Sequence, residues 1–264
     1  MITMLRRVAH LRYPLVTTIV LLVTWEASVR ILKVPVYLLP PPSLIATELL
    51  SRWDRVAAHL WVTTSVMIVG YSIAVIIALP LAVALSFSPR FEASVYPLIV
   101  FLQILPKIAI APLFVIWFGF GVLPKVLLVF LLSFFPIVVS GVAGFRSIDP
   151  EILELSRSTG ASAWLTFRLI RLPQALPQIF TGLKVAAALS ATAVIVAEFV
   201  ASDRGLGYLL LVYNGELKTP MVFATIIVLG IIGMVVYYLV ELAQRLVIPW
   251  HVSMNREAAG TTPV

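Results

Sequence analysis

The sequence predicts an all-α integral membrane protein with six transmembrane helices in one domain. Of its 264 residues, 61% are hydrophobic and only 12% are charged, whereas a soluble domain is about 45–50% apolar and about 25% charged. The mean hydropathy is +1.06, and six apolar runs reach the length of about 20 residues that a bilayer-crossing helix needs. Such a chain has too little polar surface to cover a water-soluble body.

The predicted spans follow one another without a linker or a low-complexity segment, so residues 1–264 are expected to form a single transmembrane domain. Prolines inside several of the runs are tolerated where neighbouring helices or waters satisfy the freed carbonyl groups. The spans cover approximately residues 14–32, 60–88, 94–118, 122–145, 177–200 and 220–247.

The basic segment MLRRVAHLR, which precedes the first span, predicts that the N-terminus is cytoplasmic. Six spans then return the C-terminus to the same side. In this topology ten lysines and arginines lie inside and seven lie outside. A cleaved signal peptide is the alternative, but no small-residue cleavage site follows the first run and five more runs follow it.

Composition also excludes several kinds of site. The chain has no cysteine, which excludes disulfides and zinc–thiolate centres. His10, His59 and His251 are far apart in sequence, so no metal site is expected. The net charge of +7 comes from residues between apolar runs, as the positive-inside rule places them, and indicates no nucleic-acid binding.

The segment between the fourth and fifth spans, residues 146–176, is the longest cytoplasmic loop of this topology and is expected to be folded. In SIDPEILELSRSTG, Asp149 is expected to cap a helix that begins at Pro150 and ends at Gly160. We expect Gly160 to let two helices meet closely.

A second short helix is predicted in ASAWLTFRLIRLP, where Trp164, Phe167 and Ile170 recur at three-residue spacing and Leu172-Pro173 closes the helix. The residues by themselves fit two interpretations of the resulting helix–glycine–helix elbow. One is an amphipathic helix that lies on lipid headgroups, and the other is a docking surface for a protein partner.

The spacing within this loop resembles that of ABC importer permeases. Their cytoplasmic loop has the pattern E-A-A, three residues, G, nine residues, I-x-L-P, and this chain differs from it by Leu155-Ser156 in place of the two alanines. The matching residues here are Glu154, Gly160, Ile170, Leu172 and Pro173.

The resemblance implies a type I ABC importer permease fold in which the loop carries a coupling helix that docks on an ATPase subunit. This favours docking over the lipid-surface interpretation. The residues expected at the docking site are Glu154, Arg157, Gly160, Ala161, Ile170, Leu172 and Pro173.

Other stretches resemble the branch of this family that handles sulfonates, taurine, nitrate or bicarbonate, and its relatives for thiamine pyrimidine precursors or riboflavin. They are LPPPSLI, PKIAIAPLFVIWFGFG, AEFVASDRGLGYLL and IPWH. The resemblance implies a bacterial inner-membrane location, two copies of the permease, a substrate-binding protein and two ATPase subunits. No Gly-Lys pair, and hence no P-loop, occurs in the chain, so ATP and Mg²⁺ are expected on the ATPase, with no cofactor and no enzymatic site in this chain.

Two groups of residues are candidates for the translocation path or its gate. Lys107, with Gln103 one turn before it, lies inside the third run, where a cation usually faces a bundle interior or a water-filled path. It would either attract an anionic substrate or act structurally by pairing with Gln103 or with free carbonyls.

The second group lies at the outer end of the fifth span, which Glu198 and Asp203 bracket, and also includes Gly205 and Gly207. Its glycines permit a tight turn. We expect this segment to help form the extracytoplasmic gate or the docking surface for the binding protein. An ordinary turn with solvated charges is the alternative.

Two other functions were weighed against a permease. An ion-gradient-driven secondary transporter commonly has two related halves and carboxylates at the midplane, but no repeat is evident here and Glu26, Glu198 and Glu241 lie near span ends. A membrane-embedded enzyme is disfavoured because no G-x-S-x-G or H-E-x-x-H pattern occurs.

Overall fold

A computed structural model describes residues 2–250 of the chain, and the side chains of residues 13–200 and 202–250. All regular elements in this part of the chain are helices, as predicted. They are α1 (Ile2–Ile31), α2 (Pro42–Ser51), α3 (Trp53–Phe87), α4 (Pro89–Ile104), η1 (Lys107–Ile110), α5 (Ala111–Phe118), α6 (Val122–Arg146), α7 (Pro150–Ser158), α8 (Ala163–Thr166), η2 (Phe167–Arg171), α9 (Leu172–Ala201), α10 (Leu206–Gly215) and α11 (Thr219–Val247). His251, the last residue of the IPWH stretch, lies outside the described residues.

Within residues 2–250, five helical segments are long and apolar enough to cross a membrane, which confirms the all-α membrane class. They correspond to five of the six predicted spans. The segments are Tyr13–Ile31, Trp53–Phe87, Val122–Arg146, Ala163–Val200 and Thr219–Val247.

The remaining predicted span, 94–118, is not one straight helix. α4 and the η1–α5 segment are bent by 83° relative to each other, so the chain has six spans only if this pair counts as one. The cause is local, because Pro106 disfavours the helical conformation of the residue before it. Leu105 accordingly adopts φ −58° and ψ 140°, and α4 ends there.

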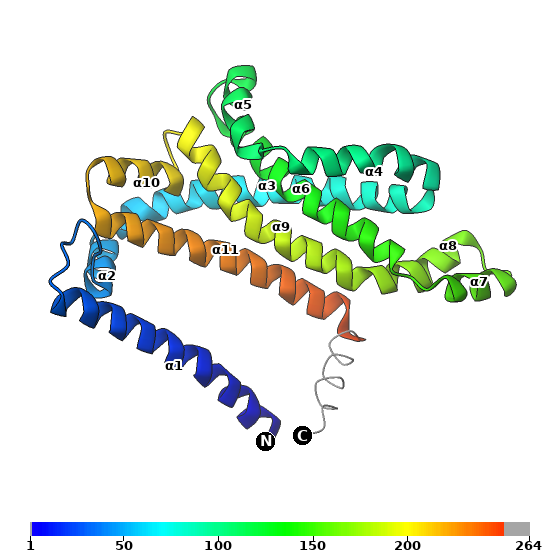
Figure 1. Ribbon diagram of the computed structural model, residues 1–264, viewed down its shortest axis with the longest axis horizontal. Helices are drawn as coiled ribbons and strands as arrows, with labels where there is room; N and C mark the ends of the chain where they lie inside the picture. Colours follow the sequence, from blue (N-terminus) through cyan, green and yellow to red (C-terminus); the bar gives the residue numbers. More distant parts are fainter. Residues whose placement is uncertain (1, 251–264) are drawn as a thin grey trace.

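The centre of the bundle is the packing of α6 against α9, with α3 and α11 beside them. Small residues let these helices approach closely. A Cβ atom on Gly182 would lie 2.8 Å from the carbonyl oxygen of Pro136, and one on Gly144 would lie 2.8 Å from that of Ala175. In Figure 1, α7 and α8 lie at one end of the bundle and α2 and α10 at the other.

Helix α1 runs along the outside of the bundle (Figure 1). Within Tyr13–Ile31, Val29 is the one buried residue. The rest of this span therefore presents apolar side chains outward, to lipid or to another chain.

Candidate functional site

The first helix of the coupling loop, residues 146–176, is built as predicted. The Asp149 Oδ1 atom accepts a hydrogen bond from the backbone N–H of Glu151 at 2.9 Å, and Pro150 lies at the first helical position. Gly160 follows the helix with φ +73°, and the N–H of Ala161 donates to the Ser156 carbonyl at 3.2 Å. This is the left-handed helix ending that glycine favours.

The expected close approach of two helices at Gly160 was wrong. A Cβ atom built on this residue would meet no heavy atom within 4 Å. The glycine is needed for its backbone conformation and not for space.

The second helix of the loop does not end at Leu172-Pro173, so that prediction was also wrong. α8 continues through the π-helical turn η2 into α9 as one apolar segment. Proline lacks an N–H and its ring crowds the carbonyl four residues earlier, here that of Leu169. The wider π turn just before Pro173 accommodates both defects.

Aromatic packing fastens the loop to the bundle. The ring of Phe167 is buried and lies 5.1 Å from that of Phe87 in α3 and 6.0 Å from that of Phe145 in α6, measured between centroids. The hydroxyls of Ser156 and Thr166 are 2.8 Å apart and join the two arms of the loop. The loop is therefore fixed to the adjacent ends of two spans, α3 and α6.

The predicted docking residues fall into two groups. Glu154, Arg157 and Gly160 are exposed and Ala161 is half-buried, and among the described residues neither charged member forms an ion pair. The other three are half-buried, and two of them pack against the main core. These three are Ile170, Leu172 and Pro173.

Three large apolar side chains are exposed beside Glu154, Arg157 and Gly160. The sequence predicted no role for two of them, Leu155 and Leu169. Leu155 is 66% exposed, Trp164 is 67% exposed and Leu169 is 63% exposed. Leu155 could have been found from the sequence, since the polar residues Glu154 and Ser156 flank it, whereas Leu169 is followed by the apolar Ile170 and carries no such signal. The loop thus presents a mixed apolar and charged surface at one end of the bundle.

The helical bend at Leu105 and Pro106 borders a cavity of about 340 Å³. The structure brings Lys107 and Gln103 together here, because the Lys107 Nζ atom donates to the Gln103 carbonyl at 2.6 Å and lies 4.9 Å from the Phe135 ring centroid. The lysine thus makes the predicted structural contact and also lines the cavity. The remaining lining residues are Pro106, Ile108, Leu132, Pro136 and Leu189.

Glu198 is fully buried, and so is not one of the solvated charges that the turn interpretation supposed. The Thr63 hydroxyl lies 2.8 and 3.0 Å from its two carboxylate oxygens, and the N–H of Gly207 donates to Oε2 at 2.7 Å. The same hydroxyl accepts from the N–H of Leu206 at 2.7 Å. These contacts join α3, α9 and the start of α10, and we call them the Glu198 clasp.

The two predicted glycines are part of the clasp. Gly205 has φ +114°, and a Cβ atom there would overlap the Glu198 carboxylate; at Gly207 it would lie 2.8 Å from the Glu198 Cβ. Asp203 is not part of the clasp, because it is exposed and its nearest charged partner is Arg204 at 3.8 Å.

His59 belongs to this region although the sequence assigned it no role. Its Nδ1 atom accepts from the N–H of Gly205 at 2.9 Å, and its ring stacks on Tyr208 at a centroid distance of 6.0 Å. His59 and Thr63 are four residues apart on α3, a helical spacing that marks one face.

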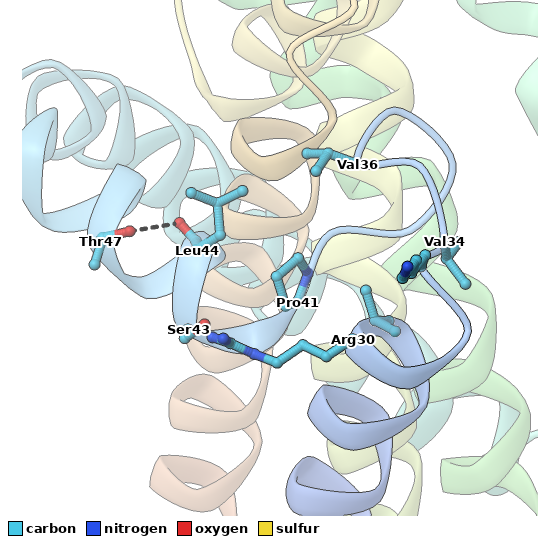
Figure 2. Close-up of a pocket in the computed structure, with 9 residues that line it drawn as sticks. Arg30, Val34, Val36, Pro41, Ser43, Leu44 and Thr47 are labelled. Atoms are coloured by element: carbon cyan, nitrogen blue, oxygen red, sulfur yellow. Dashed lines mark hydrogen bonds between the residues drawn. The ribbon is translucent and has the colours of Figure 1, made fainter.

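A second cavity, of about 500 Å³, lies at the same end of the bundle between the end of α1, the loop after it and the start of α2. Figure 2 shows Arg30 extending across this pocket toward Ser43. The Glu26 carboxylate accepts from Arg30 Nε at 2.6 Å and from the Ser43 N–H at 3.0 Å, and so ties α1 to the start of α2. Lys33 also lines the pocket.

The fold, the loop and the apolar spans define a membrane permease, and comparison with known proteins gives its family. The chain belongs to the family described as "Binding-protein-dependent transport system inner membrane component", whose model matches residues 70–251. It is the transmembrane permease subunit of an ATP-driven ABC importer, a multi-pass inner-membrane protein that works with ABC ATPase and substrate-binding partners. The ion-gradient-driven alternative is not favoured.

Several curated permeases are similar over nearly their whole length. The chain is 35% identical to the riboflavin transport system permease protein RibX of Chloroflexus aurantiacus, with 90% of each chain covered. It is 32% identical to the formylaminopyrimidine transport permease protein ThiX of Halalkalibacterium halodurans, over 90% of this chain and 95% of ThiX. It is also 32% identical to the taurine transport system permease protein TauC of Escherichia coli, over 89% of this chain and 88% of TauC.

Among solved structures, the fold is similar to that of a chain of the MetNI methionine ABC transporter in an inward-facing conformation. The TM-score is 0.61 at 18% sequence identity, with 75% of this chain and 97% of that chain covered. This similarity of fold confirms the predicted importer-permease architecture.

Proposed function

We propose that two copies of this chain form the translocation path of an importer, with two ATPase subunits docked on their coupling loops. ATP and Mg²⁺ bind to the ATPase subunits, and this chain supplies neither a cofactor site nor a catalytic site. The termini lie in the cytoplasm, on the side of the coupling loop, in agreement with the basic residues near the N-terminus. Residues 1–264 act as one permease domain.

The observation that carries this proposal is the exposed surface of the coupling loop. Trp164 and Leu155 supply apolar contact area, and the unpaired Glu154 and Arg157 supply charge-assisted hydrogen bonds. The buried side of the loop, which includes Ile170 and Leu172, anchors this surface to the bundle. An interface of this kind needs a partner whose groove accepts a short rigid helix.

Co-purification from the native host tests the proposal. The tagged chain is extracted in mild detergent as wild type and as the Glu154→Lys, Gly160→Leu double variant. We expect an ATPase with a P-loop to accompany the wild type and to be lost from the variant, because the variant reverses one docking charge and strains the φ +73° position.

The matched control is Glu216→Lys, Gly215→Leu, which makes the same two changes at exposed residues at the other end of the bundle. A Cβ atom at Gly215 would meet no heavy atom within 4 Å, and this control should retain the ATPase. If no ATPase accompanies the wild type while the binding protein does, the docking proposal fails.

The transported solute is a small molecule delivered by the binding protein, either a sulfonate-, taurine- or nitrate-like anion or a heterocyclic vitamin precursor. The names of RibX, ThiX and TauC support both classes. Replacing Lys107 distinguishes the two solute classes, because its ammonium group lines the cavity at the bend and would attract an anion.

For an anionic solute we expect Lys107→Met to reduce uptake about tenfold or more, because methionine keeps the length of the side chain and removes its charge. Uptake of a radiolabelled alkanesulfonate into proteoliposomes of the assembled importer measures this, with riboflavin uptake as the neutral comparison. Normal uptake by the variant would remove the anion-attracting role and leave Lys107 as the structural partner of Gln103.

At the outer end, we propose that residues 198–210 form part of the gate and of the surface on which the binding protein docks. The Glu198 clasp supports this, because it fixes the turn from α9 to α10 against α3. Asp203 and Arg204 are exposed on this turn and available to a partner.

A further inference from the structure

Helix α4 makes one polar contact to another element at each of its ends: an ion pair in its first turn, and a hydrogen bond from Lys107 to the Gln103 carbonyl in its last turn. Ile99 is the one buried residue among its described side chains. Arg146, in the last turn of α6, forms an ion pair with Glu92 in the first turn of α4. The guanidinium group also lies 4.9 Å from the ring centroid of Tyr96, one turn further along α4. Glu92 and Tyr96 are four residues apart and so share one face of the helix. Arg146 therefore contacts α4 at two successive turns.

Arg146 stands at the base of the coupling loop. The chain leaves α6 at this residue, and α7 begins at Pro150. Any displacement of α7 relative to the bundle is therefore applied first to Arg146, and through its ion pair to Glu92.

The other arm of the loop contacts the last turn of α3, just before α4 begins. Arg171, at the end of η2, donates from Nη1 to the Ser86 carbonyl at 3.5 Å, and its guanidinium lies 5.8 Å from the Phe87 ring centroid. Phe87 in turn contacts Phe167. One arm of the loop thus contacts the first turn of α4, and the other contacts the last turn of α3, one residue before the N-cap of α4.

The far end of α4 reaches the cavity. Gln103 lies in its last turn and lines the cavity together with Lys107, which follows the 83° bend. α4 has 16 residues, which makes it about 24 Å long at 1.5 Å per residue. A helix of this length, with Pro97 as its internal proline, connects a movement at its first turn to Gln103 at its last.

We propose that α4 is the lever that transmits coupling-loop movement to the Lys107 cavity, with Glu92 and Arg146 as the positioning residues that join the lever to the loop. This inference rests on the proposed function, because the ATPase supplies the movement. Ion pairs that reach solvent usually contribute little to stability, and in this pair the Arg146 side chain is 56% exposed while that of Glu92 is 19% exposed. Breaking this pair should therefore impair coupling while leaving the fold intact.

The test uses the assembled importer with its ATPase and binding protein. We expect Glu92→Gln to leave ATPase co-purification and basal ATP hydrolysis unchanged. Transport per ATP hydrolysed should fall at least about fivefold, the lower end of typical coupling effects. The charge swap Glu92→Arg, Arg146→Glu should restore at least half of the loss, which a purely structural role for either residue would not explain.

A matched control is Glu241→Gln. Glu241 pairs with Arg245 within the single helix α11, and the exposures of the two pairs are similar at 24% and 64% against 19% and 56%. The Glu241–Arg245 pair connects α11 to no other helix, so transport per ATP hydrolysed should stay at the wild-type value in Glu241→Gln.

A second readout measures the movement itself. The chain has no cysteine, so spin labels can be attached at Leu98→Cys on α4 and Leu239→Cys on α11, both exposed. The label-to-label distance should change between nucleotide-free and ATP–vanadate states, and Glu92→Gln should abolish this change.

A distance change that persists in Glu92→Gln, or undiminished transport per ATP, overturns the lever. So does a charge swap that restores nothing. Failure of the ATPase to bind the wild-type chain is a different result, because it overturns the proposed function and the lever with it.

Discussion

The Gly205→Ala substitution is expected to destabilise the folded chain by about 2–6 kcal/mol. The backbone contributes about 1–3 kcal/mol, because φ +114° is strained for any residue with a Cβ atom. Overpacking contributes a further 1–3 kcal/mol or so, since the added methyl group would overlap the Glu198 carboxylate. That carboxylate cannot easily move away, because Thr63 and the Gly207 N–H hold both of its oxygens.

Thermal unfolding in detergent measures this effect, and Gly215→Ala is the control. Gly205 is the N-cap of α10 and Gly215 is the last residue of that helix, where a Cβ atom would meet no heavy atom within 4 Å. The Tm of Gly215→Ala should therefore equal that of the wild type or be slightly higher. Binding of the substrate-binding protein should weaken in Gly205→Ala under conditions where the chain remains folded. A Tm equal to that of the wild type would mean that the clasp does not constrain the turn from α9 to α10.

The second large effect is expected at Trp164. Trp164→Ala should weaken ATPase binding by about 2 kcal/mol or more, which is about 30-fold, because aromatic anchors at the centre of an interface dominate its binding energy. The side chain is 67% exposed in the isolated chain and stacks on Phe167 at 5.9 Å. It is thus held in a fixed orientation before any partner arrives, which reduces the entropic cost of docking.

Titration of the purified ATPase against the permease in nanodiscs gives the two affinities. Trp61→Ala is the control, since Trp61 is 74% exposed but lies on α3 outside the coupling loop. Equal affinity for wild type and Trp164→Ala would instead support the interpretation that this helix rests on lipid headgroups.

The parts of the site that sequence reasoning predicted are those that local chemistry determines. Asp149 and Gly160 set the two ends of α7 through contacts within a few residues, and the spacing from Glu154 onward carries the family pattern. Five of the six predicted spans follow from apolar run length, whereas the 83° bend in the span at 94–118 does not. Each of these signals is complete within one short stretch of chain.

The parts that sequence reasoning missed depend on partners far away in the chain. Thr63 and Glu198 are 135 residues apart, and such a pair leaves no periodic trace in one sequence. The π turn before Pro173 was missed for a different reason. Proline usually ends a helix, and only the preceding wide turn, stabilised by the packing of Phe167, lets this one continue.

The outward-facing α1 has a consequence for how the protein is made. Its residues 13–31 bury almost nothing within the chain, and the family model begins only at residue 70. During synthesis α1 can therefore insert into the bilayer first, and the later helices can assemble without contacting it. Among the described side chains, the contacts of Glu26 and Arg30 with Ser43 and of Trp25 with Phe223 then join it to the finished bundle. Exchange of one aliphatic residue for another along α1 should accordingly be tolerated far better than the same exchange in α6.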